Sequence, residues 1–279
     1  MKSHFYDLLH KMEIEPIAEL NRLDTLFTSE KSVVVEGFPR DYYYTLEQFI
    51  DNTIFRSLPF RGTYTNIREM RVALNIASYQ FDDSIECLFL YCEFLKAILP
   101  FVNHKNASAM NQIIIIFNNI DVVLEKTNYE WLERSSREFI IVEKNKITTE
   151  AVEIIKDDAT AIKAIEYNHY ALKGDLGKKK EILLKLADYV EPLLKSRKLE
   201  QNGFSDLQSD LGFVLNNFNI RHNNIDGNNA KEYVVKLTKT SELEKWYDNA
   251  YEMILMATIT ADHIDITNEL KRIKSSFRW

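Results

Sequence analysis

The chain has 279 residues, enough for one large domain or two ordinary ones, and 46% of the residues are hydrophobic. With only 7 glycines and 5 prolines, long helices are favoured over a protein built from short strands and turns. Residues 1–159 contain 17 Lys and Arg against 25 Asp and Glu, and residues 160–279 contain 18 against 17. Because phosphate binding needs clustered positive charge, this balance argues against DNA as a partner but leaves a local RNA contact open in the C-terminal part.

The N-terminal part combines several helical segments with two short β-like segments. Helix-favouring residues predict helices over 3–29, 41–58, 82–99, 107–126 and 149–156. In the longer of these segments, apolar residues also recur every three or four positions. Asn66 and Ser84 are expected to begin helices as N-caps. Runs of β-branched residues predict strands at 32–38 and 137–144, which we expect to pair. The predicted fold class is mainly α: helical bundles with at most a small two-stranded sheet in the N-terminal half.

The C-terminal part has the clearest helical pattern. Its first apolar stripe runs from Ile162 through His169 to Leu172, and others follow within 178–195, 204–218 and 243–258, with a short helix near 231–237. Four stripes with short links predict an up-down bundle. The pair Asp157-Asp158 marks the predicted boundary between a mostly helical N-terminal domain, 1–157, and this bundle, 158–279. The run 178–180, three lysines, is expected to be a solvated helix face, with contact to RNA phosphates as the alternative.

The cysteines and the N-terminus indicate the cellular compartment. Cys87 and Cys92 lie five residues apart on one predicted helix, where they do not share a face, so we expect two reduced thiols. The first residues are charged throughout and contain no apolar core of signal-peptide length. The longest apolar run, 113–117, is too short to span a bilayer. We therefore expect a cytoplasmic protein without membrane contact.

A polar segment, 215–227 (LNNFNIRHNNIDG), is the most distinctive part of the sequence. Arg221 offers a fork of donors that suits phosphate, and His222 is the side chain best placed to move protons near neutral pH. Arg and His side by side suit RNA cleavage, in which a base activates the 2′-hydroxyl and a cation stabilises the charged phosphorane. Asn223, Asn224 and Asp226 would support this pair.

A helical bundle that carries this pattern at the end of its third helix resembles the HEPN superfamily, which includes abortive-infection and toxin ribonucleases of bacterial phage defence. The hallmark of that family is an Arg, a polar residue and, a few positions later, a His. Arg221 and His222 match the first two positions, whereas residues 224–228 contain no His. The resemblance covers at most residues 159–279. It implies a metal-independent endoribonuclease that acts as a homodimer, with Arg221 holding the scissile phosphate.

Three residues outside the segment complete the predicted site. His169 is expected to face the bundle interior, where it is either a core histidine or the missing second histidine that meets Arg221 or His222. Asn168 would turn with it, and Asp248 is expected to pair with Arg221. The catalytic prediction is therefore Arg221 with His222.

Other interpretations of the sequence remain open. Arg221 can instead neutralise a helix C-terminus, with the asparagines bonding to loop carbonyls. The protein would then be a non-catalytic interaction module such as a sensor, an adaptor or a toxin-neutralising partner. The sequence contains no Walker, HExxH, GxSxG or GxGxxG motif and no metal-ligand pattern, so we expect no cofactor and no metal.

Overall fold

A computed structural model describes residues 13–103, 105–238 and 241–277. Helices form 67% of the structure, and the described residues contain two small two-stranded antiparallel sheets, so the mainly α prediction is confirmed. The chain divides into two compact units, Met1–Ile141 and Val142–Trp279. The second unit begins earlier than the predicted boundary at 157/158, because α7 (Lys146–Ile154) packs on helices of the C-terminal unit.

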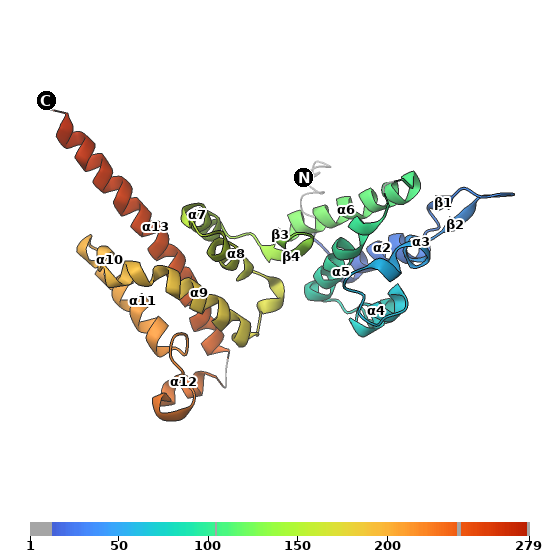
Figure 1. Cartoon of the computed structure of the whole chain (residues 1–279). Coiled ribbons are helices and arrows are strands. Elements are labelled where there is room, and N and C mark those ends of the chain that lie inside the picture. Colours follow the sequence, from blue (N-terminus) through green and yellow to red (C-terminus); the bar gives the residue numbers. More distant parts are fainter. Residues whose placement is uncertain (1–12, 104, 239–240, 278–279) are drawn as a thin grey trace, which may run out of the picture. The chain divides into compact units, whose positions relative to one another are not determined.

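The first unit is a helical assembly with two hairpins (Figure 1). Helix α5 (Ile85–Ile98) is capped by Ser84 and α6 (Ala107–Thr127) by Asn106, and Asn128 ends α6 in the left-handed conformation. Asn66 caps α4 (Ile67–Ala73), as predicted. In chain order the elements are α2 (Pro16–Asp24), a short π-helix (Thr25–Ser29), β1 (Val33–Val35), β2 (Tyr42–Tyr44), α3 (Leu46–Thr53), α4 (Ile67–Ala73), α5 (Ile85–Ile98), α6 (Ala107–Thr127), β3 (Tyr129–Ser135) and β4 (Glu138–Glu143).

The predicted strand pairing is wrong. The first strand, β1, pairs with β2, with Val33 opposite Tyr44, and β4 pairs with β3. Residues 42–44, predicted to be helical, are thus the return strand of a local hairpin, and α3 begins only after the Thr45 cap. Hairpins between neighbouring segments close short loops, whereas the predicted pairing needed a loop of about a hundred residues.

Two further features of this unit bear on the sequence predictions. Both cysteines are unpaired on α5, and burial raises the pKa of the Cys92 thiol. Among the described residues, one helix, α6, is long and apolar enough to cross a membrane by length and composition. Its side chains Ile113, Ile116 and Ile120 are buried in the first unit, as in the core helix of a globular domain.

A buried guanidinium joins three helices of the first unit. Arg71 of α4, 5% exposed, donates to Asp24 of α2, to Glu47 of α3 (3.2 Å) and to the Ile76 carbonyl (3.3 Å). The Tyr91 hydroxyl of α5 also donates to Asp24 (2.9 Å), and the guanidinium lies over the Tyr91 ring, 5.4 Å from its centroid. Burial raises the pKa of Glu47, although Arg71 lowers it in part. We call these four side chains the Arg71 centre.

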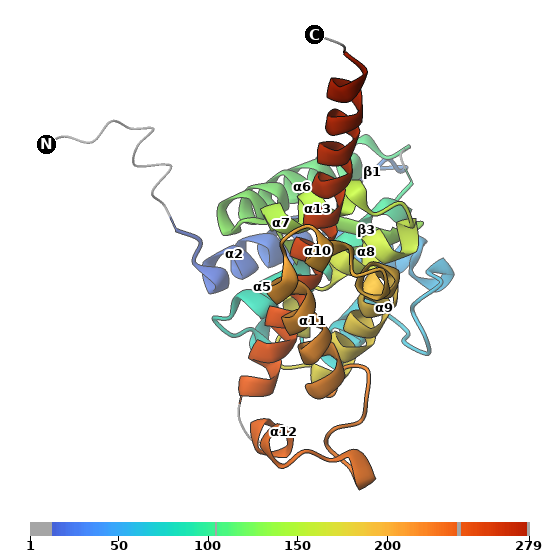
Figure 2. The ribbon, with the colours of Figure 1, turned by 90° about the vertical axis from the view of Figure 1, so that its left-hand side faces the viewer.

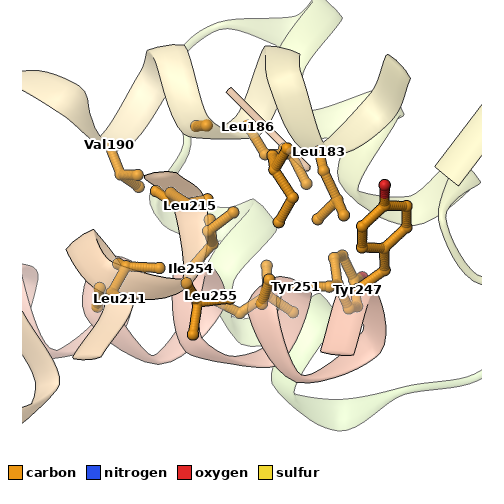
Figure 3. Packing of buried hydrophobic residues seen from close by; sticks show 14 of the residues in the cluster. Leu183, Leu186, Val190, Leu211, Leu215, Tyr247, Tyr251, Ile254 and Leu255 are labelled. Atoms are coloured by element: carbon orange, nitrogen blue, oxygen red, sulfur yellow. The ribbon is translucent and has the colours of Figure 1, made fainter. Parts of the chain in front are cut away.

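The second unit is built around three helices, α9 (Leu176–Lys195), α11 (Ser205–Asn217) and α13 (Glu242–Ser276). Their apolar faces meet in one core, to which α9 contributes Leu183 and Leu186, α11 contributes Leu215, and α13 contributes Ile254 and Leu255 (Figure 3). The remaining elements are α7, α8 (Asp158–Glu166), α10 (Lys198–Gln201) and α12 (Glu232–Leu237). In Figures 1 and 2 the last turns of α13 run on past the ends of α9 and α11.

The first helix of the predicted bundle is shorter than expected. It ends at Glu166, and His169 has extended backbone angles, so His169 does not belong to its apolar stripe. His169 instead forms an antiparallel bridge with Val142. Pairing with β4 therefore replaces the helical turns that the spacing predicted.

Candidate functional site

The segment predicted to be functional lies where α11 ends. Asn219 adopts a left-handed conformation (φ 61°), and the Arg221 N–H donates back to the Leu215 carbonyl (3.0 Å). Phe218, the last residue before this turn, packs on Trp246 of α13 with ring centroids 4.5 Å apart. The chain therefore reverses over the helix end, and an aromatic contact with α13 anchors the reversal.

Two buried asparagines fix this reversal. The Asn219 N–H donates to Asn224 Oδ1 (2.9 Å), and the Asn224 N–H donates to Asn219 Oδ1 (3.2 Å). Asn219 also donates to the Tyr247 hydroxyl (3.3 Å) and accepts from Lys180 Nζ (3.2 Å). Asn224 was predicted to support a catalytic pair, but these bonds give it a structural role. Asn219 was not predicted to be important, although it is one of five asparagines in the segment.

Arg221 faces α9. Its guanidinium is half-buried, and Nη2 donates to the Ala187 carbonyl (2.8 Å). The Lys195 ammonium, and less strongly Arg221, lower the pKa of the Glu191 carboxyl. The guanidinium thus stabilises a carbonyl in the middle of α9 and a carboxylate of its own chain, whereas the structural interpretation of the segment expected it at a helix C-terminus.

His222 points into a different environment from Arg221. It is exposed and lines an open hollow of about 630 Å³. The other lining residues are mostly amides and include one cation: Asn216, Asn217, Asn224, Asn228, Asn229, Ala230 and Lys231. Lys231 Nζ donates to Asn217 Oδ1, and Arg221 is not part of the lining. The hollow therefore offers many neutral hydrogen-bonding groups, but the predicted Arg–His pair does not converge in it.

Two more predicted residues, Asn223 and Asp226, shape the loop itself. Asn223 Oδ1 accepts from the Ile225 N–H (3.2 Å) and from the Asp226 N–H (3.1 Å). This is an Asx turn, in which a short polar side chain replaces a backbone acceptor. Both side chains are exposed, and the observed bonds assign them to loop geometry.

His169 and Asn168 are held by other elements. The His169 ring contacts Tyr170 edge-on, with centroids 4.7 Å apart, beside the bridge to Val142. Asn168 Nδ2 donates to the Thr148 hydroxyl (3.1 Å) and the Tyr251 hydroxyl (3.0 Å). The two hydrogen bonds attach Asn168 to α7 and α13, and the bridge attaches His169 to β4. The predicted meeting of His169 with Arg221 or His222 is not among them.

The predicted ion pair between Asp248 and Arg221 is wrong. Asp248 Oδ1 instead accepts from Lys179 Nζ (2.7 Å) and from the Tyr167 hydroxyl (2.9 Å). Lys179, the middle lysine of the run at 178–180, is only 7% exposed, so the prediction of a solvated lysine face is wrong at this position. Its ammonium also pairs with Glu244 (2.8 Å) and lies 5.4 Å from the centroid of the Tyr167 ring.

These four side chains, Lys179, Glu244, Asp248 and Tyr167, form a second charge cluster around a buried cation, which we call the Lys179 centre. Burial opposes ionisation of Glu244, but the Gly174 N–H and the Lys179 ammonium outweigh it and lower the Glu244 pKa. Burial also raises the pKa of Tyr167, and its neutral hydroxyl is the donor that Asp248 needs. The centre joins α9 to α13 and to the chain after α8.

A stacked tyrosine continues this network into the core. The Tyr251 ring lies parallel to that of Tyr167, with centroids 4.1 Å apart, and its hydroxyl donates to the Ala164 carbonyl (2.8 Å). The Thr148 hydroxyl lies 2.7 Å away. Burial raises the pKa of Tyr251 to about 12, although hydrogen bonds from Thr148 and Asn168 lower it in part. Every polar group here has an internal partner, so this network suits structure rather than proton transfer.

Over residues 13–103, 105–238 and 241–277, no group of three or more His, Cys, Asp or Glu side chains is placed to hold a metal ion. Comparisons with protein-family models, curated protein sequences and solved structures found no match.

Proposed function

We propose that the protein is a non-catalytic interaction protein that binds a protein partner through the C-terminal turns of α13. One observation carries this proposal. After Ile264, the last buried residue of α13, the helix continues to Ser276 with large apolar side chains in solvent. Ordered apolar surface of this kind marks contact sites, because its exposure to water is otherwise unfavourable.

The contacts of the polar segment support the non-catalytic part of this proposal. Arg221 bonds to a carbonyl of α9, and Asn219 and Asn224 bond to each other. The groups suited to phosphate chemistry therefore make bonds that hold the turn after α11 in place. A ribonuclease needs a cation and a proton-transfer group in the same accessible site. Arg221 is absent from the hollow that His222 lines.

An RNA-degradation assay tests the absence of catalysis. Wild type, Arg221→Ala and His222→Ala are incubated with tRNA and with total RNA, and the products are resolved on denaturing gels. His263→Ala is the matched control, because His263 is also exposed and lies on α13. We expect no cleavage by any of the four proteins. Cleavage by wild type and the control that is lost in both other variants would overturn the proposal.

A second function, an RNA-directed effector of HEPN type in phage defence, is favoured by the hollow itself. His222 and the surrounding amides are accessible, and amide groups can read the hydrogen-bonding edges of unpaired bases. Binding of a fluorescently labelled single-stranded RNA tests it. This function predicts that His222→Ala combined with Asn228→Ala weakens binding about thirtyfold while His263→Ala does not, since each of the two lost hydrogen bonds contributes about 1 kcal/mol. Equal binding by all three proteins would exclude the hollow as an RNA site.

A further inference from the structure

Three aromatic rings of the first unit surround the ammonium of Lys96, which lies in the last turn of α5. Its Nζ is 4.8 Å from the centroid of the Phe117 ring of α6. It is 5.2 Å from the Trp131 ring of β3 and 4.8 Å from the Phe139 ring of β4. The Trp131 and Phe139 rings meet at 80°, and β3 lies against α6 (Figure 1). We call these three rings the aromatic cage.

The contacts of Lys96 show that the cage holds a cation by ring faces. Among the residues that the structure describes, Lys96 has no hydrogen-bond acceptor and no ion-pair partner besides these rings, so its three N–H donors are left to solvent. A primary ammonium is strongly hydrated, whereas a quaternary ammonium has the same charge and no N–H donor to satisfy. Cages of aromatic faces recognise such alkylated cations. The cage therefore suits an alkylated ammonium better than the lysine that it holds.

The spacing and exposure of the rings leave room for such a group. Non-bonded heavy atoms pack at about 3.5–4.0 Å, and the three nitrogen-to-centroid distances exceed this separation by about 1 Å. Methyl groups on the nitrogen would fill that space and reach the ring faces. Lys96 and the three rings are half-buried, so the cage is open to solvent on one side. The flexible four-carbon stem of lysine can therefore swing out of it.

We propose that the aromatic cage binds an external alkylated ammonium group, and that Lys96 occupies the cage until this ligand displaces it. Small quaternary ammonium compounds and methylated lysine side chains share this head group. The acidic balance of residues 1–159, with 17 Lys and Arg against 25 Asp and Glu, favours the approach of a cation. The cage lies in the first unit, so this binding is independent of the contact proposed for α13.

Isothermal titration calorimetry with choline on the full chain tests the displacement. Lys96→Ala empties the cage, and we expect it to bind choline about tenfold more tightly than wild type, because only molecules with an open cage can bind. The uncharged isostere of choline, in which carbon replaces nitrogen, should bind Lys96→Ala more weakly than choline does. Equal choline affinities of Lys96→Ala and wild type would overturn the displacement. An isostere that binds as tightly as choline would overturn recognition of the charge.

Two further variants locate the binding. Adding Trp131→Leu to Lys96→Ala keeps an apolar side chain but removes a ring face, so the gained affinity should be lost while circular dichroism stays unchanged. Adding Phe139→Leu instead is the second test, should the first variant fail to fold. Lys31→Ala removes an exposed lysine of the same unit outside the cage, and it should bind choline as wild type does. Undiminished choline binding in a folded leucine variant would overturn the cage as the site.

A peptide that carries trimethyllysine separates the two sources of the head group. Its affinity for Lys96→Ala is compared with that of choline and with that of the same peptide carrying unmodified lysine. Tighter binding of the methylated peptide than of choline supports a protein ligand, and equal or weaker binding supports a small molecule. Failure of both choline and the methylated peptide to bind Lys96→Ala would overturn the proposal.

Discussion

Both units of the molecule bury one cation between two carboxylates and a tyrosine, but they assemble this centre differently. The Arg71 centre takes Asp24, Glu47 and Tyr91 from three separate helices. The Lys179 centre takes both carboxylates from adjacent turns of α13, and one of them, Asp248, keeps 47% of its side chain exposed. In the Arg71 centre the carboxylates are 13% and 19% exposed.

The two units therefore depend on their cations to different degrees. A planar guanidinium has five donors in a fixed fork and serves several fixed acceptors at once, so Arg71 determines how three helices meet. An ammonium is a compact charge that adapts to its partners, and a half-exposed carboxylate can return to water if the cation is lost. We therefore expect the first unit to be the more sensitive to loss of its cation.

Arg71→Met should have the largest effect. It leaves Asp24 and Glu47 covered and unpaired, which costs about 3–5 kcal/mol of unfolding free energy. Urea unfolding followed by circular dichroism measures the loss. Arg71→Lys, which keeps the charge but removes the fork, should fall between wild type and Arg71→Met. A loss below about 1 kcal/mol in Arg71→Met would show that the centre tolerates the missing charge.

Lys179→Met should lower the free energy of unfolding by less, about 1–3 kcal/mol, because Asp248 is half-exposed and Glu244 keeps its bond from the Gly174 N–H. The same urea titration gives the value. Lys178→Met is the matched control, since the neighbouring lysine is exposed and its removal should change stability by under about 0.5 kcal/mol. A loss in Lys179→Met as large as that of Arg71→Met would remove the distinction between the two centres.

Arg221→Ala should destabilise the second unit by about 1–2 kcal/mol, because the Ala187 carbonyl loses its charged donor. His222→Ala should stay within about 0.5 kcal/mol of wild type, because the imidazole is exposed. Thermal unfolding of both variants side by side measures the difference. Equal melting temperatures for Arg221→Ala and wild type would remove the structural role assigned to Arg221.

Glu244 and Glu47, one from each centre, should change the free energy of unfolding in opposite directions as pH falls, and this is the smallest effect that we expect. The Glu244 pKa is lowered in the fold, so its contribution to stability is present above the ordinary value of 4.5 and is lost as pH falls through the folded pKa. The Glu47 pKa is raised, so its contribution is present below 4.5 and is lost as pH rises through its folded pKa.

Stability measured as a function of pH between about 3 and 7 tests this contrast. Glu244→Gln should make unfolding less sensitive to acid than in wild type, and Glu47→Gln should make it more sensitive. Parallel pH profiles for the two variants would contradict the assigned directions.

Much of the secondary structure was predictable because its causes are local. The helix predicted over 107–126 is observed as Ala107–Thr127, and that predicted over 82–99 as Ile85–Ile98. Apolar spacing and the Asn66 and Ser84 caps act within a few residues of each helix end, so the sequence itself carries these signals.

The candidate site was predictable in location but not in its contacts. The sequence correctly indicated that 215–227 crowds polar groups at a helix end. It did not indicate that Arg221 faces α9, that His222 faces a separate hollow, or that Lys179 is buried. The contacts of Arg221 and Lys179 depend on partners far along the chain, and the hollow at His222 depends on how the loop after α11 folds back.

The helical class, the main helices and the polar turn after α11 follow from the amino-acid sequence alone, because propensity, periodicity and capping are properties of neighbouring residues. Only the tertiary structure decided the strand partners, the conformation at His169 and the choice of Lys179 rather than Arg221 as the partner of Asp248. Those outcomes depend on which groups packing brings within hydrogen-bonding distance and removes from water, and burial then makes each such pairing obligatory.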